Sequence, residues 1–115
     1  MAPRKLNPVL DDILDAIDGI EAAVHGKTFE EFQSDWLLRH GVQRGLEIIS
    51  EASRHIPEAL LVHAPGVPWR EVRSIGNLLR HEYHRIADAI IWNAVVDELG
   101  PLRRGVEAIR AALRE

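Results

Sequence analysis

The residues best suited to chemistry lie between Trp69 and Arg85, where basic and polar side chains recur at helical spacing. The set is Arg73, Asn77, Arg80, His81 and His84. The last four lie four, seven, eight and eleven residues after the first. On an α-helix these positions fall within about 100° of one another. If the segment is helical, one of its faces presents two guanidinium groups, one amide and two imidazoles.

These side chains suit a phosphodiester. Arginine offers fixed, bidentate donors for phosphate oxygens and for charge that develops in a transition state. Imidazole has an unperturbed pKa of about 6.5, so it can both take and give protons near neutrality. Asn77 can hydrogen-bond either a ligand or His81, one turn further along. Arg70, His84 and Arg85 extend the cluster as further candidates for contacts with RNA or phosphate.

Two other interpretations of this cluster stay open. It could be the solvated end of a helix, where basic side chains satisfy free backbone carbonyls. His81 and His84 could also form a metal pair at i and i+3, but the other four histidines are scattered along the chain. We therefore expect no metal site. Because no glycine-rich phosphate loop is present, we expect no cofactor either.

Length and composition predict one globular domain, residues 1–115. Hydrophobic residues make up 46% and charged residues 28% of the chain, which is ordinary for a folded protein. The absence of cysteine excludes disulfides, a thiolate nucleophile and cysteine-based zinc sites. With no signal-like segment and no apolar run of membrane-spanning length, we expect a cytoplasmic protein that does not enter a membrane. The net charge of −4 means that the arginines between residues 70 and 85 form a local basic patch on an acidic body.

Helical periodicity dominates the first half of the sequence. Asn7 as a cap and Pro8 at the first helical position predict the start of a helix, which Gly26 ends. Thr28 and Glu31 have the spacing of a capping box. The helix that begins there is expected to break or restart near residues 34–35. Apolar positions then recur from residue 36 to residue 56, with a proline as the stop signal.

The second half of the sequence predicts a loop and further helices. Residues 57–68 contain three prolines and predict a loop with at most one helical turn. Trp69 opens the next helix, another spans residues 88–99, and Gly100-Pro101 separates it from a last helix over residues 102–113. The fold class is therefore an all-α antiparallel bundle of four to five helices.

The expected helix over residues 88–99 has almost no polar face. A bundle of this size has difficulty burying one helix on all sides, so a second copy of the chain is the natural cover. We therefore predict a homodimer. The alternative is that the helix lies in the centre of the bundle.

The residues from Gly76 to Tyr83, Gly-Asn-Leu-Leu-Arg-His-Glu-Tyr, resemble the RNxLxHxY signature of HepT-like proteins of the HEPN superfamily. Segments on either side resemble the family as well, so that the resemblance covers nearly the whole chain; they are residues 10–17, 46–52, 67–69, 91–92 and 99–102. The resemblance implies a helical bundle that dimerises, with the motif residues of both subunits lining a shared cleft. It implies a toxin-type ribonuclease that cleaves RNA without metal. It also implies a partner, a nucleotidyltransferase antitoxin of the MNT type.

The resemblance gives three residues a role. His81 matches the motif histidine, which would act as the general acid or base. Asn77 matches the motif asparagine, which we expect to orient the histidine or the substrate. Tyr83 matches the tyrosine that the antitoxin adenylylates to silence the nuclease.

The chain departs from the signature at one position, because Gly76 stands where the family arginine usually lies. Arg73, one turn earlier, and Arg80, next to His81, are the two candidates to stabilise charge on the phosphate. The expected catalytic set is therefore His81, Arg73, Asn77 and Arg80. The alternative is a weakened family member that only binds a nucleotide, RNA or the nucleotidyltransferase.

Overall fold

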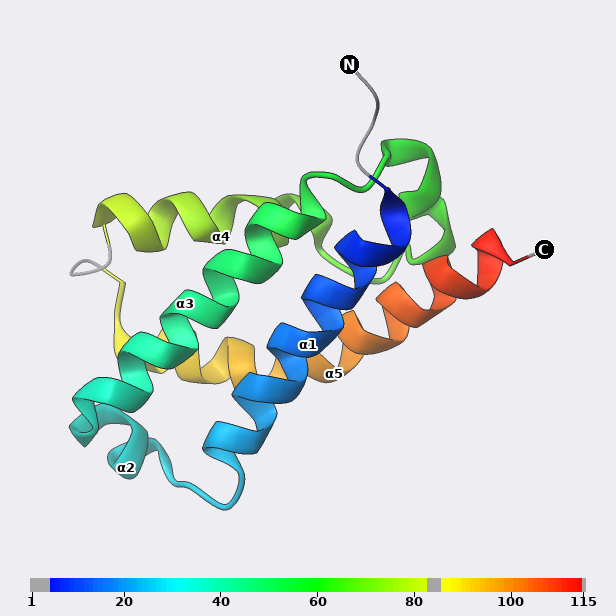
Figure 1. The fold of residues 1–115 in the computed structure, drawn as a ribbon. Helices are drawn as coiled ribbons and strands as arrows, with labels where there is room; N and C mark the ends of the chain where they lie inside the picture. Colours follow the sequence, from blue (N-terminus) through cyan, green and yellow to red (C-terminus); the bar gives the residue numbers. More distant parts are fainter. Residues whose placement is uncertain (1–4, 83–85, 115) are drawn as a thin grey trace.

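The computed structural model describes residues 5–82 and 86–114, and these fold into helices (Figure 1). The α-helices are α1 (Leu6–Val24), α2 (Phe29–Ser34), α3 (Trp36–Ser53), α4 (Trp69–Glu82) and α5 (Asp88–Leu113), and a 3₁₀ helix, η1 (Glu58–His63), lies between α3 and α4. Within the described ranges there is no strand. The predicted all-α fold class is thus confirmed.

The helices pack around a single apolar core. α1 runs antiparallel to α3 and packs against both α3 and α5, while α4 packs against α3 (Figure 1). The short helix α2 contacts α3 and α5, and η1 contacts α5. The largest fully buried side chains are Phe32, Leu10, Ile13, Ile17, Ile49, Ile56, Ile91 and Ile109. α4 therefore lies at one side of the bundle, where one of its faces is open.

Local signals set most helix ends. The Thr28 hydroxyl accepts from the Glu31 backbone N–H at 3.1 Å, and the Glu31 carboxylate accepts from the Thr28 N–H at 3.0 Å. Hydrogen bonding from the backbone N–H of Thr28, and then from its side chain, lowers the pKa of the Glu31 carboxyl. The side chain of Asp35 accepts from the Leu38 N–H at 3.0 Å and starts α3. The predicted capping box and the restart of the helix after residues 34–35 are both confirmed.

The ends of α1 confirm one prediction and correct another. Gly26 has a φ of 72°, a left-handed conformation that favours glycine, and the helix ends just before it as expected. At the other end α1 begins at Leu6, with Lys5 at the cap position and no side-chain cap. The prediction of an Asn7 cap was therefore wrong by two residues.

The prediction of two helices separated at Gly100-Pro101 was wrong, because α5 continues through Pro101 to Leu113. The reason lies in the apolar pattern on both sides of the proline. Buried residues recur every three or four positions without a break, at Ile91, Val95, Leu99, Leu102, Val106 and Ile109. Burial of this continuous stripe against the core outweighs the backbone hydrogen bond that a proline removes.

The apolar first half of α5 is partly covered within the chain. Trp92 is half-buried and its ring lies 5.1 Å from that of Phe32 and 6.4 Å from that of Phe29, centroid to centroid. Ile90 and Val96 are each 59% exposed. The chain's own helices therefore bury one side of this segment, as the alternative of central burial predicted, but they leave another side exposed. No helix in the described part of the chain is both long and apolar enough to cross a membrane.

Candidate functional site

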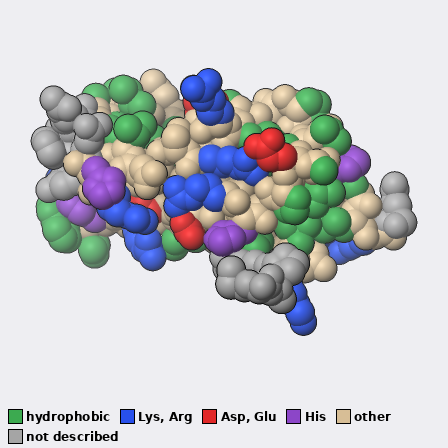
Figure 2. Space-filling model, turned by 90° about the horizontal axis from the view of Figure 1, so that it is seen from above, with side chains coloured by type: hydrophobic (Ala, Val, Ile, Leu, Met, Phe, Trp, Pro, Cys, Tyr) green, Lys and Arg blue, Asp and Glu red, His purple; other side chains and the backbone are tan. Residues whose placement is uncertain are grey.

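α4 presents an amphipathic surface, with apolar residues toward α3 and polar residues toward solvent. Its first residue is anchored, because the Trp69 indole N–H donates to the Ala64 carbonyl at 3.0 Å. Leu79 is buried, and Val72 and Ile75 are half-buried. The exposed residues of the other face include Arg70, Ser74, Asn77, Arg80 and His81. Seen from above, basic side chains gather along the middle of this side of the molecule, with carboxylates between them (Figure 2).

Asn77, Arg80 and His81 are the predicted residues that this face leaves available to a ligand. The Arg80 side chain is 52% exposed, and its Nε lies 3.8 Å from a carboxylate oxygen of Glu47 on α3. Asn77 and His81 are exposed, and neither side chain has a hydrogen-bond partner among the described residues. Because Asn77 and His81 are four residues apart on a continuous helix, their side chains share one face of α4.

Arg73 belongs to the same helix but its guanidinium is engaged elsewhere. Nη2 donates to the Ile56 carbonyl at 2.7 Å and Nε donates to the Ser53 carbonyl at 3.3 Å. Nη1 forms an ion pair with Glu58 at 3.2 Å, and the side chain is only 21% exposed. Arg73 thus satisfies carbonyls at the end of α3, which is the role that the alternative interpretation of the cluster gave to its basic residues.

Gly76 lies where the backbone of α4 comes close to Ser50 of α3. The Ser50 hydroxyl donates to the Arg73 carbonyl at 2.9 Å and accepts from the Gly76 N–H at 3.0 Å. A Cβ atom at position 76 would lie 2.8 Å from both Cβ and Oγ of Ser50, which is too close for any side chain. Glycine therefore fits this contact, and the arginine of the signature that the chain resembles would require Ser50 or its helix to shift.

Tyr83, His84 and Arg85 lie outside the described residues. The modification of Tyr83 and the contacts predicted for His84 and Arg85 therefore stay predictions. Arg70 is described; it is exposed at the first turn of α4, and no described carboxylate pairs with it.

A hollow of about 670 Å³ opens beside the polar face of α4, between that helix, η1 and the end of α3. We call it the η1–α4 hollow; it is lined by Arg54, Glu58, Leu61, Val62, Trp69, Arg70, Arg73, Ser74 and Asn77. Sequence reasoning missed Arg54, Leu61 and Val62, because they come from elements that only the fold brings next to α4. Arg54 is also bound to Glu51. Together with His55, it lowers the pKa of that carboxyl.

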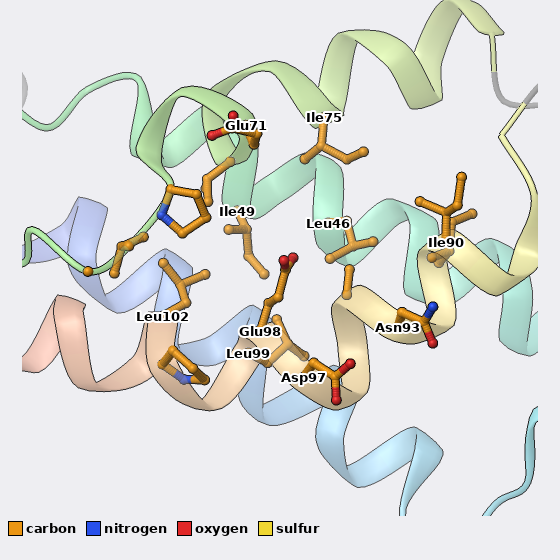
Figure 3. A pocket seen from close by; sticks show the side chains of 17 residues that line it. Leu46, Ile49, Glu71, Ile75, Ile90, Asn93, Asp97, Glu98, Leu99 and Leu102 are labelled. Atoms are coloured by element: carbon orange, nitrogen blue, oxygen red, sulfur yellow. The ribbon is translucent and has the colours of Figure 1, made fainter.

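A second cavity, of about 580 Å³, lies on the opposite face of α4, between α4 and α5 (Figure 3). We call it the α4–α5 groove. Its floor is apolar and includes Leu46, Ile49, Ile75 and Leu102. Its charged lining residues are all acidic: Glu71, Asp97 and Glu98. Figure 3 shows the carboxylate of Glu98 directed into the cavity. α4 thus separates a basic hollow from an acidic, apolar groove.

The described residues contain no group of three histidine, aspartate or glutamate side chains placed to hold a metal ion. The bundle and the polar face of α4 define a helical domain whose described candidate residues, Asn77, Arg80 and His81, share one helix.

Comparison with known proteins places the domain in a family. The chain matches the family described as "Ribonuclease HepT-like" over residues 13–109. It is 35% identical to "Probable ribonuclease HepT" of Thermococcus cleftensis, over 93% of this chain and 97% of that protein. It is 31% identical to "Putative RNase MJ1380" of Methanocaldococcus jannaschii, over 95% of this chain and the full length of that protein. No solved structure matches the chain.

The chain therefore belongs to the HepT-like ribonuclease family. The predicted family membership is confirmed, and the relatives' names support a ribonuclease-type function.

Proposed function

We propose that this protein is a metal-independent RNA endonuclease and that it acts as the toxin of a HepT/MNT-type toxin–antitoxin pair. The observation that carries the proposal is the exposed face of α4. There the motif residues Asn77 and His81 lie together with Arg80, in a chain that belongs to a ribonuclease family. His81 takes or gives a proton at the 2′-hydroxyl or at the leaving oxygen, and Asn77 orients the histidine or the substrate.

Arg80 is the arginine that stabilises charge on the scissile phosphate. It is half exposed, adjacent to His81 and held only at 3.8 Å from Glu47. Arg73 is instead bound to two carbonyls and a carboxylate, so using it on a phosphate would leave those groups without their donor. Of the two predicted candidates, the contacts of the described residues favour Arg80.

The active form is a homodimer in which the α4–α5 groove faces a second copy of the chain. The groove has an apolar floor, and Ile90 on its rim is 59% exposed. An exposed apolar surface of this kind is typical of a subunit interface. The family resemblance implies a cleft shared by the motif residues of both subunits; a dimer through this groove would leave Asn77 and His81 of each copy on the other face of α4.

The decisive experiment is RNA cleavage by the purified wild-type protein beside His81→Ala, in excess EDTA. We expect cleavage that survives the chelator and is lost in the variant. Intact mass must first show that the wild-type protein is unmodified, because an adenylylated protein would be silent. Unmodified wild-type protein that leaves RNA intact would overturn the nuclease proposal.

The proposed antitoxin is a nucleotidyltransferase that adenylylates Tyr83. Co-expression with such a partner is expected to add one or more adenylyl groups to the protein and to abolish cleavage. Tyr83→Phe is the matched control, since it keeps the ring and removes the acceptor hydroxyl. Unchanged mass of the wild-type protein after co-expression would contradict this regulation and leave the nuclease proposal standing.

A second candidate function is a binding module without catalysis. Two observations favour it: Gly76 replaces the family arginine, and Arg73 is committed to the end of α3. The same cleavage experiment separates the two functions, because a binding module would retain RNA or the nucleotidyltransferase but would not cut RNA.

A further inference from the structure

The η1–α4 hollow contains features that packing does not explain. Val62 is 70% exposed and stands on the wall of the hollow, next to the half-buried Leu61. Three arginines and one glutamate supply the charged lining, so the hollow is positive although the chain as a whole carries a net charge of −4. An apolar wall beside guanidinium groups fits a ligand that has both a flat apolar part and an anionic part.

The three arginines of the hollow differ in how far their positive charge is already paired. The guanidinium of Arg73 is already bound to Ile56, Ser53 and Glu58. Arg54 is 33% exposed and shares its charge with Glu51, whereas Arg70 is exposed and has no paired carboxylate among the described residues. Arg70 is therefore the guanidinium that is available to a phosphate.

The hollow adjoins the proposed catalytic residues. Asn77 lines it, and His81 follows four residues later on the same helix, about 6 Å along the helix axis. Arg70 lies eleven residues before His81, about 16 Å along the same axis, so a strand with one phosphate at His81 would place another phosphate, a few nucleotides along, at Arg70. The α4–α5 groove on the other face of α4 is lined by three carboxylates and would repel a polyanion.

We propose that the η1–α4 hollow binds a nucleotide a few positions along from the scissile phosphate of a single-stranded RNA. Arg70 holds the phosphate of that nucleotide, and its base lies against Val62 and Leu61. The strand must be single because a base inside a duplex cannot lie against a protein side chain. This assignment rests on the proposed function, and it adds Arg70, Val62 and Leu61 to the residues that bind the substrate.

The test measures binding of a short, unstructured, fluorescently labelled RNA by anisotropy over a range of salt concentrations. All variants carry His81→Ala, so that the RNA is not cut during the measurement. Arg70→Ala is expected to weaken binding and to lower the slope of log Kd against log salt by about 0.7, the value for one lost phosphate contact on a single strand. Arg104→Ala on α5, also an exposed arginine, removes the same charge and is expected to leave the slope unchanged.

A gain of affinity tests the base contact. Val62→Trp adds a stacking surface to the wall of the hollow and is expected to tighten binding about fivefold or more. Val96→Trp is the matched control, because Val96 is also an exposed valine and lies on α5 outside both cavities. Equal affinities and equal salt slopes for the hollow variants and their controls would overturn the assignment.

The failure of this inference can be told apart from failure of the proposed function. If the wild-type protein cleaves RNA but Arg70→Ala and Val62→Trp bind like their controls, the nuclease stands and the hollow is not its subsite. If the wild-type protein does not cleave RNA but the hollow variants change binding as expected, the subsite stands in a protein that only binds RNA.

Discussion

Gly76 illustrates how packing can constrain a single residue, at a position where the signature that the chain resembles has an arginine. Ser50 of α3 fills the space beside it and bonds to the backbone of α4 on both sides, at the Arg73 carbonyl and the Gly76 N–H. A side chain at position 76 would therefore require Ser50 or its helix to shift. The catalytic arginine, if there is one, must come from another position.

The first prediction concerns this contact. Gly76→Ala is expected to lower the free energy of unfolding by about 1–3 kcal/mol, because its Cβ would overlap Ser50. Gly19→Ala is the control: it is also inside a helix, but a Cβ there meets nothing within 4 Å. The control should raise the free energy of unfolding by about 0.5–1 kcal/mol. Urea unfolding of both variants checks the prediction, and equal effects would contradict it.

The second prediction separates the two arginines. Arg73→Ala should lower the free energy of unfolding by about 2 kcal/mol, because buried carbonyls lose a charged donor. Arg80→Ala should change stability by less than about 0.5 kcal/mol, since its side chain is half exposed and only loosely paired. For the rate of RNA cleavage we expect the larger effect from Arg80→Ala, a loss of about 100-fold or more.

Stability by urea unfolding and single-turnover cleavage rates are measured on the same two preparations. A stable Arg73→Ala protein with a greatly reduced rate would show that Arg73, and not Arg80, contacts the phosphate.

At the scale of the elements, the sequence predicted those features that depend on near neighbours. The capping box at Thr28 joins residues three positions apart, and so does the cap at Asp35. The helical face with Asn77, Arg80 and His81 also follows from spacing alone. Signals of this kind are present in the chain before it folds, and the structure confirms the helices that they predicted.

The features that sequence reasoning missed depend on residues far apart in the chain. The carbonyls that hold Arg73 belong to residues 17 and 20 positions earlier, and Ser50 lies 26 positions before Gly76. The wall of the η1–α4 hollow likewise comes from η1 and α3. No periodicity in the sequence encodes these contacts, because they arise only when α3, η1 and α4 pack together.

The third prediction concerns Pro101 in α5. A proline inside a helix removes one backbone hydrogen bond and its ring crowds the preceding turn, at a cost of about 3 kcal/mol in a free helix. Because the apolar stripe of α5 holds the helix together on both sides, Pro101→Ala should raise the free energy of unfolding by about 1–3 kcal/mol. Thermal and urea unfolding measure the change. A loss of stability would mean that the bend or rigidity introduced by Pro101 is needed for packing.

At the scale of the whole molecule, charge is sorted between the two faces of α4. The arginines line the hollow on one face, and the carboxylates Glu71, Asp97 and Glu98 line the groove on the other. The net charge of −4 for the whole chain does not reveal this separation of charge. This distribution agrees with the proposed function, in which RNA meets the basic face and a second copy of the chain covers the apolar floor of the α4–α5 groove.

The last prediction tests the proposed dimer through that groove. Ile90→Asp places a charge on an exposed apolar rim, so it should convert the dimer to a monomer with little loss of helix content. Leu113→Asp, at an exposed leucine at the end of α5 and outside the groove, should remain a dimer. Mass by light scattering and helix content by circular dichroism are measured together. If the dimer is needed for catalysis, Ile90→Asp should also lose RNA cleavage while Leu113→Asp keeps it. A wild-type protein that is monomeric at the concentrations where it cleaves RNA would show that one α4 face is sufficient for the reaction.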